Sequence, residues 1–176
     1  NGTLAAPASL EGETWDAFVD ISADDGETWE MSSIVPIKWR FEDGIPEDVY
    51  YCRGKGVIQP TLWESTPGKV HMLLRSTGGN IYRSDSEDYG RTWSTAYSIG
   101  IPNNNSGIDL VKMEDETLVL CCNPVGIPEG KWGGPRTPIV LMISYNNGLT
   151  WEHFHTLEDI EGEFSYPAII AGGKKL

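Results

Sequence analysis

Two arginines, Arg75 and Arg136, have the chemistry needed to bind a carboxylate in a chain that is otherwise acidic. The 176 residues include 13 Lys and Arg against 26 Asp and Glu, which gives a formal net charge of −13. A guanidinium offers a planar pair of N–H donors that matches a carboxylate. Because the net charge of the chain repels anions, an anionic ligand would need such a local basic site. The alternative is that each arginine forms an ordinary surface ion pair.

Amide, carboxylate and aromatic side chains that suit a sugar occur where strands are predicted to begin and in one long loop. Gln59, Asn104 and Asp109 can hydrogen-bond sugar hydroxyls, and the flat face of Trp132 can stack on a sugar ring. A plain turn explains the Asn103–Asn105 run nearly as well. Burial in a β-sheet protein is the alternative for Trp132.

Composition argues against several other functions. The acidic charge repels nucleic acid and anionic membranes, and no apolar run approaches the ~18 residues that a membrane span requires. His153 and His155 lie on one face of a predicted strand without a third ligand, so we predict no metal site. The Gly-rich pairs at 78–79 and 133–134 lack the Lys-Ser/Thr of a phosphate loop, and we predict no cofactor.

One octapeptide recurs three times and indicates which elements position these residues. Its copies begin at Ser22, Ser86 and Ser144 and share the pattern SxDxGxTW, with Asn146 replacing Asp in the third copy. The Asp or Asn accepts hydrogen bonds from backbone N–H groups of its own loop, and Gly supplies a positive φ. Thr then begins the returning strand, and Trp covers the junction. Each copy is therefore predicted to be a structural corner between two antiparallel strands.

Alternation of apolar and polar residues places strands around these corners. The predicted strands are Thr3–Ser9, Asp16–Ser22, Thr28–Ser33, Val57–Glu64, Lys69–Ser76, Asn80–Ser86, Thr92–Ser98, Ile108–Glu114, Thr117–Asn123, Thr137–Ser144, Thr150–Leu157 and Phe164–Ile170. Four strands between equivalent points, with the octapeptide joining the third to the fourth, are the anatomy of a propeller blade. We therefore predict an all-β protein, a partial β-propeller over residues 1–176.

The chain does not begin and end at the boundaries of predicted blades, but is shifted by one strand. Blade A (1–34) lacks its inner strand, blades B (57–98) and C (107–157) are complete, and 164–170 is the inner strand of a blade D. Propellers close with roughly four to eight blades, so about three blade equivalents cannot close a ring. Either the chain is a fragment, or two copies associate so that 164–170 of one completes blade A of the other.

This topology also predicts where a binding site lies. The octapeptide corners share one end of the propeller with the tight links between first and second strands. The opposite end collects the links between second and third strands and those between blades, which contain Arg75, the 123–136 loop, Gln59, Asp109 and Tyr166. Polar groups that converge at one mouth, some of them basic, are what a sugar pocket requires.

The SxDxGxTW pattern is the Asp box, or BNR repeat, and the chain resembles the sialidase-like BNR family over nearly its whole length. The segments Val57–Glu64, His71–Ser76 and Phe164–Pro167 look like that subfamily. The resemblance implies a six-bladed propeller and a secreted or periplasmic exo-glycosidase acting on a terminal acidic or related sugar. Sialidases use a Tyr nucleophile, an Asp acid/base and an arginine cluster for the substrate carboxylate. The same turn occurs in non-enzymatic propellers, so a propeller that only binds glycans or proteins is the alternative.

Carried over by residue, the resemblance implies that Tyr166 is the nucleophile, with Glu163 close to it. A structural Tyr that fills the central channel is equally compatible with the sequence. Asp16 is nearest in order to the family's acid/base, with Glu11 and Glu13 as alternatives. Arg75 and Arg136 would grip the carboxylate, but the Phe-Arg-Ile-Pro segment that supplies the family's first arginine is absent from this chain.

Overall fold

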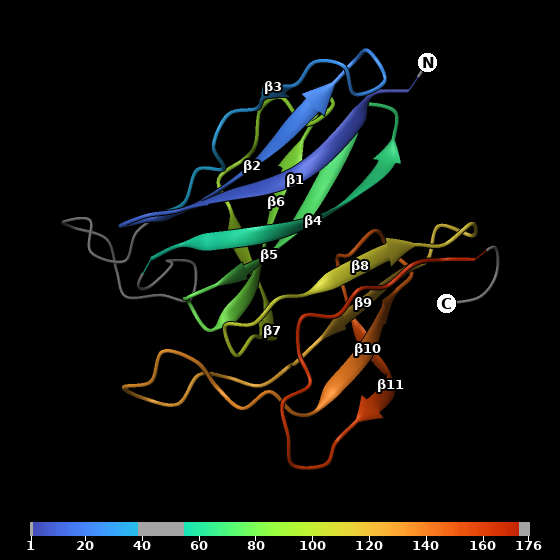
Figure 1. Ribbon diagram of the computed structural model, residues 1–176. Helices are drawn as coiled ribbons and strands as arrows, with labels where there is room; N and C mark the ends of the chain where they lie inside the picture. Colours follow the sequence, from blue (N-terminus) through green and yellow to red (C-terminus); the bar gives the residue numbers. More distant parts are fainter. Residues whose placement is uncertain (1, 39–54, 173–176) are drawn as a thin grey trace.

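The computed structural model describes residues 2–38 and 55–172, which form three antiparallel sheets that pack face to face (Figure 1). The first sheet has the order β1-β2-β3, the second β4-β5-β6-β7 and the third β11-β10-β9-β8. The strands are β1 (Leu4–Glu11), β2 (Trp15–Ser22), β3 (Glu30–Met31), β4 (Val57–Thr66), β5 (Lys69–Ser76), β6 (Asn80–Ser86), β7 (Tyr97–Pro102), β8 (Asp109–Lys112), β9 (Leu118–Cys122), β10 (Ile139–Ser144) and β11 (Glu152–Glu158). The predicted all-β, blade-like architecture is confirmed. Among the described residues, no helix combines the length and apolar character that crossing a bilayer requires.

The octapeptides are the corners that the sequence predicts. In the first copy, the Ser22 hydroxyl accepts a hydrogen bond from the Gly26 N–H at 2.8 Å, and the Asp24 carboxylate accepts one from the Thr28 N–H at 2.9 Å. Gly26 has a φ of 93°, in the region that favours glycine. The second copy repeats these bonds. The corners thus join β2 to β3, β6 to β7 and β10 to β11.

The third corner shows how an amide replaces the carboxylate. Asn146 Oδ1 accepts the Thr150 N–H at 2.9 Å, as the Asp does in the other copies. Its Nδ2 donates to the Thr150 hydroxyl at 2.7 Å, so this hydroxyl accepts where Thr28 and Thr92 donate. Asn146 therefore preserves the turn without its charge.

The returning strands begin later than predicted. The sequence places them at Thr28, Thr92 and Thr150, whereas β3, β7 and β11 begin at Glu30, Tyr97 and Glu152. Each Thr N–H is bonded to the Asp or Asn of its own corner, which keeps the Thr itself out of the strand. A backbone donor used by the turn cannot also bond to a neighbouring strand.

The core consists of side chains buried between neighbouring sheets. Met72 and Leu74 of β5 pack with β2 residues, while Leu73, between them in sequence, packs with residues of the third sheet. This is the alternation expected of a strand covered on both faces. Cys122 belongs to the cluster between the second and third sheets and Cys121 to the opposite face of the third sheet, and both thiols are buried.

The segment Phe164–Ile170 differs from the predicted inner strand, because the structure assigns no strand there. It is not a member of any of the three sheets. Individual bonds hold it instead, from the Phe164 N–H to the Arg136 carbonyl and from the Ile169 N–H to Asp109 Oδ2, both at 2.9 Å. These two bonds position Tyr166.

Candidate sugar-binding site

Arg75 is the centre of the candidate site. It is at the end of β5, with 6% of its surface exposed. Its Nε donates to Asn105 Oδ1 at 2.9 Å, and its Nη1 donates to Gln59 Oε1 at 3.0 Å and to the Tyr166 hydroxyl at 2.8 Å. Gln59 lies in β4, Asn105 precedes β8, and Tyr166 follows β11. One guanidinium therefore connects a neighbouring strand of its own sheet, the link from the second sheet to the third, and the segment that follows the third sheet.

The three partners of Arg75 share an unusual backbone conformation. Gln59, Asn105 and Tyr166 have φ values of 52°, 63° and 55°, in the left-handed region. This region costs a residue with a Cβ roughly 1–2 kcal/mol. Such strain persists where the surrounding structure enforces it, and it clusters at binding and active sites. Here the left-handed turns coincide with the side chains that contact the guanidinium.

Tyr166 lies between two cations and remains half exposed. The guanidinium carbons of Arg75 and Arg136 are 5.6 Å and 5.1 Å from the centroid of its ring, within the range of cation–π attraction. The ring also packs on Gly107, where an added Cβ would lie only 2.7 Å from the Tyr166 ring. In this chain 50% of the Tyr166 surface is exposed.

Arg136 is held by the residues that precede Tyr166. Its Nη1 donates to the Ser165 hydroxyl at 2.8 Å and is 3.3 Å from the Glu163 carboxylate. The Glu163 side chain is 74% exposed, against 30% for that of Arg136. The structure thus pairs Glu163 with the arginine, and no bond between Glu163 and the Tyr166 hydroxyl is found.

Two tryptophans form an aromatic wall beside Arg75. The Arg75 guanidinium lies 5.1 Å from the centroid of Trp15, and Trp132 meets Trp15 edge to face at 5.3 Å. The Trp132 carbonyl also accepts a hydrogen bond from Asn105 Nδ2 at 3.0 Å. With 56% of its surface exposed, Trp132 lines a cleft of about 320 Å³ between residues 77–79 and 127–132.

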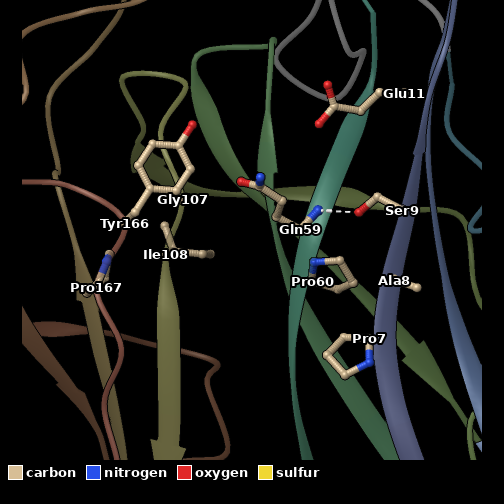
Figure 2. A pocket seen from close by; sticks show the side chains of 10 residues that line it. All are labelled: Pro7, Ala8, Ser9, Glu11, Gln59, Pro60, Gly107, Ile108, Tyr166 and Pro167. Carbon is tan, nitrogen blue, oxygen red and sulfur yellow. Dashed lines mark hydrogen bonds between the residues drawn. The ribbon is translucent and has the colours of Figure 1, made fainter.

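A second cleft, of about 440 Å³, opens beside Tyr166 (Figure 2). Tyr166 and Pro167 form one wall, and residues of β1 and β4 form the other. Figure 2 shows the Gln59 N–H bonded to the Ser9 hydroxyl across these two strands, at 2.8 Å. Glu11 contributes a carboxylate to the same cleft. The cleft therefore presents a phenol, an amide and an acid to a ligand, with Arg75 directly behind them.

The whole chain, residues 1–176, matches the BNR repeat-like domain. The chain belongs to the BNR repeat-like family. No curated protein matches the sequence.

Solved structures similar to this BNR repeat-like chain include sialidases. Trypanosoma rangeli sialidase in complex with the inhibitor DANA has a TM-score of 0.60 at 15% identity, over 91% of this chain and 24% of that one. The Hadza microbial sialidase Hz136 has a TM-score of 0.60 at 18% identity, over 85% and 26% of the two chains. A Dyadobacter fermentans protein of unknown function also has a TM-score of 0.60, at 17% identity over 92% and 39%.

These likenesses establish a shared fold. The BNR repeat-like chain spans about a quarter of the length of the sialidases it matches. At such identities the similarity shows a shared arrangement of blades, and it does not show a shared activity. The site residues must therefore be judged on their own geometry.

Of the predicted acids, only Glu11 lines the cleft with Tyr166. Asp16 is half-buried in β2, where it accepts a hydrogen bond from the Thr14 hydroxyl at 3.0 Å. Glu13 is exposed in the turn between β1 and β2 and also does not line the cleft. The family's order of residues pointed to Asp16, whereas the acid that lines the cleft is Glu11.

Asn104 and Asp109 support the site from within the protein. Asn104 is 2% exposed, and its amide bonds to the Pro135 carbonyl and to the Ser106 hydroxyl. Asp109 Oδ1 accepts the Thr61 hydroxyl at 3.0 Å, and its Oδ2 holds the backbone of the Tyr166 segment. Both polar groups are therefore used by the protein itself. The residue of the asparagine run that contacts Arg75 is the next one, Asn105.

Sequence reasoning missed Trp15, Gly107 and the role of Asn105. Asn105 was within a run already noted, but a left-handed backbone reverses the expected side-chain direction. Trp15 begins a strand, where aromatic residues are normally core. Nothing in the sequence marks Gly107 as the surface on which the tyrosine ring rests.

No cluster of three or more His, Cys, Asp or Glu side chains suited to a metal ion occurs in residues 2–38 and 55–172. His153, one of the noted pair, is hydrogen-bonded to the Thr156 hydroxyl at 3.0 Å. Both histidines of the pair are exposed.

Proposed function

We propose that this chain contributes the acidic-sugar site of a sialidase-like exo-glycoside hydrolase. The observation that carries the proposal is the half-exposed Tyr166 hydroxyl, which accepts a hydrogen bond from Arg75 beside a second guanidinium, that of Arg136. A phenol flanked by two cations at the edge of a cleft is the combination that sialidase chemistry uses.

The arginines support an acidic substrate. Both are positive groups in a chain with a formal charge of −13. Arg75 is preoriented by Gln59, Asn105 and Tyr166, so little side-chain entropy is lost when a ligand binds. Arg136 pairs with the exposed Glu163, and a sugar carboxylate can replace this carboxylate as its partner. A neutral sugar would gain neither interaction.

The cleft also offers the groups for bond cleavage. In the proposed first step, the Tyr166 oxygen attacks the anomeric carbon and loses its proton to water, the glycosidic C–O bond breaks, and protonated Glu11 gives its proton to the leaving oxygen. Water then attacks the anomeric carbon of the glycosyl–tyrosine and gives a proton to Glu11, and the released tyrosine oxygen takes up a proton from water to regenerate the phenol. Asp16 is the alternative acid/base by family order.

Trapping of the covalent intermediate tests this proposal. A Trypanosoma rangeli sialidase has been solved with 2,3-difluorosialic acid as a covalent intermediate. The full-length form of the present protein, incubated with the same compound, should gain the mass of one sugar on the peptide that contains Tyr166. Tyr166→Phe should abolish both the adduct and the release of a fluorophore from a sialoside. Turnover that survives Tyr166→Phe would exclude this residue as the nucleophile.

A specific observation favours the second candidate, a propeller that binds acidic glycans without cleaving them. Within the described residues, no carboxylate forms a hydrogen bond with the Tyr166 hydroxyl, and the side chains bonded to Arg75 are all neutral ones, those of Gln59, Asn105 and Tyr166. A tyrosine nucleophile needs a group that accepts its proton. Binding of a sialoside with no turnover at any pH between 4 and 8, and equal affinity in Tyr166→Phe, would support this alternative.

A further inference from the structure

A second cluster of reactive side chains lies at the opposite end of the propeller, among the octapeptide corners. The Ser65 hydroxyl is 2.8 Å from His71 Nε2, and His71 Nδ1 is 2.6 Å from Asp85 Oδ1. The three residues occupy three neighbouring strands, β4, β5 and β6, and His71 pairs directly with Asp85 in the sheet. A hydroxyl, an imidazole and a carboxylate linked in this order form the arrangement that activates a serine nucleophile.

His71 has the tautomer that a general base for Ser65 requires, with the proton on Nδ1 and the lone pair on Nε2. Burial alone would raise the pKa of Asp85, but hydrogen bonds from His71 and Arg83 lower this pKa to about 2. The carboxylate is therefore ionised at neutral pH and can only accept, so the proton of the neutral imidazole lies on Nδ1. Arg83 Nη2, 3.0 Å from the same nitrogen, is also a donor and cannot bond to it in this tautomer. Nε2 is then an acceptor, with the Ser65 hydroxyl at 2.8 Å and Asn147 Nδ2 at 3.2 Å as its two donors.

The scaffold around His71 is rigid. Trp63 stacks on the imidazole at 4.9 Å between centroids, and the Arg83 guanidinium lies 5.1 Å from the Trp63 ring. The side chain of His71 is 10% exposed. Ser65 itself lies where the register between β4 and β5 shifts, between Glu64 and Thr66. Bulges of this kind redirect a side chain and occur often beside active sites.

Ser65 also faces a space that a ligand could enter. A cleft of about 500 Å³ is lined by the two tight links and by the third octapeptide, with Ser65, Thr66, Lys69, Lys112, Glu116 and Tyr145–Asn147 at its surface. Ser65 is half-buried, so its hydroxyl is reachable from this side. The two lysines are paired with Glu87 and Glu116, so the cleft has no net preference for an anion.

Asn147 provides a fixed donor beside the serine. Its Oδ1 accepts the Trp63 indole N–H at 2.7 Å, which orients the amide, and its Nδ2 is 3.2 Å from His71 Nε2. Asn147 also lines the cleft. An amide N–H held in this way can stabilise the negative oxygen that forms when a serine attacks a carbonyl.

We propose that Ser65, His71 and Asp85 form a second reactive site, which transfers the acyl group of a small ester. Ser65 Oγ attacks the carbonyl carbon and gives its proton to His71 Nε2, while Asn147 Nδ2 binds the developing oxyanion. The ester C–O bond then breaks, and His71 returns the proton to the leaving alkoxide. Water repeats the sequence on the acyl-serine and releases the acid. His71 is the general base, and Asp85 is a positioning residue.

A fluorophosphonate probe tests the proposal on the full-length protein. We expect covalent labelling of the peptide that contains Ser65 and hydrolysis of p-nitrophenyl acetate. Both should be lost in Ser65→Ala and unchanged in Thr66→Ala, a matched control that removes a neighbouring hydroxyl of the same cleft. Tyr166→Phe should also leave both unchanged, because Tyr166 belongs to the other end of the propeller.

The base and the positioning residue are tested separately. His71→Gln should slow labelling at least about 100-fold, since a general base contributes roughly 100- to 10,000-fold. Asp85→Asn should lower kcat for the ester and leave KM unchanged. If His71→Gln does not fold, Asp85→Asn decides alone. A fluorophosphonate adduct that maps elsewhere, or a Ser65 that reacts equally fast in Asp85→Asn, would overturn the proposal.

Discussion

Arg75 Nη1 donates a hydrogen bond of 2.8 Å to the hydroxyl of Tyr166, a residue that lies beyond the third sheet. The same guanidinium binds two other segments through Gln59 and Asn105. The position of the phenol therefore depends on a side chain of the second sheet, from which it is separated in sequence by the whole third sheet. This dependence gives the first prediction.

Arg75→Lys should weaken binding of sialic acid at least about tenfold, because an ammonium cannot reproduce a planar fork of donors. We also expect the free energy of unfolding to fall by about 1–3 kcal/mol, since buried partners lose their hydrogen bonds. Calorimetric titration and urea unfolding would measure the two effects. Arg91→Lys, at an exposed arginine of the second octapeptide, is the matched control and should change neither.

Gly107→Ala should displace the tyrosine ring, because the new methyl carbon would lie 2.7 Å from a Tyr166 ring atom. Sialoside turnover or binding should fall markedly while the melting temperature changes little, since the ring can rotate toward solvent. Gly126→Ala, where nothing lies within 4 Å of the added carbon, should leave binding intact. Equal effects of both substitutions would mean that the ring does not depend on Gly107.

Acid should destabilise the fold through the octapeptide corners. Hydrogen bonds from the Thr28 side chain and backbone lower the pKa of Asp24 to about 2 from 3.8. For Asp88, burial acts to raise the pKa, but bonds from Thr92 and Ser86 lower it to about 2. Because the folded-state pKa is the lower one, the stabilisation is complete above the unfolded value and is lost as the pH falls from about 4 toward 2.

The third corner suggests the variant that tests this pH dependence. Asn146 forms the same turn without a titrating group. Asp24→Asn combined with Asp88→Asn should therefore flatten the decrease in urea midpoint between pH 4 and pH 2. A decrease as steep as in the unmodified protein would assign the acid sensitivity to other groups, among them Asp85.

The adjacent thiols should resist alkylation in the folded protein. Burial raises the pKa of Cys122 to about 12, with a further contribution from Cys121, and burial raises that of Cys121 to about 11. The thiolate is the reactive form, so iodoacetamide at pH 8 should leave both residues unmodified until urea is added. Peptide mapping by mass spectrometry would follow the two sites. Rapid labelling of Cys122 in native buffer would contradict its burial between the second and third sheets.

The corners and most strands could be predicted from the sequence because their signals are local. The Ser, Asp, Gly and Thr of each octapeptide bond mainly within the octapeptide itself. The sequence placed each Thr in the returning strand because Thr favours strands. In the structure, the N–H of each Thr is hydrogen-bonded to the Asp or Asn of its own corner instead.

The candidate site was predictable only in outline. Topology places Arg75, Gln59 and Tyr166 at one mouth, and the structure brings them into contact. The distinction between Asn104 and Asn105, and between Asp16 and Glu11, depends on backbone dihedrals and on the relative placement of sheets. Neither the dihedrals nor the placement of the sheets produces a periodic pattern in the sequence. The Ser65–His71–Asp85 arrangement was also invisible, because its members are common strand residues until their register is known.

The left-handed residues around Arg75 have a consequence for how function is lost. Gln59, Asn105 and Tyr166 reach the guanidinium only when their separate segments are docked in register. A chain whose sheets are intact but slightly displaced would keep its circular dichroism spectrum and lose its ligand. The affinity for a ligand therefore reports small errors in the packing of neighbouring sheets that the measured content of β-sheet does not report.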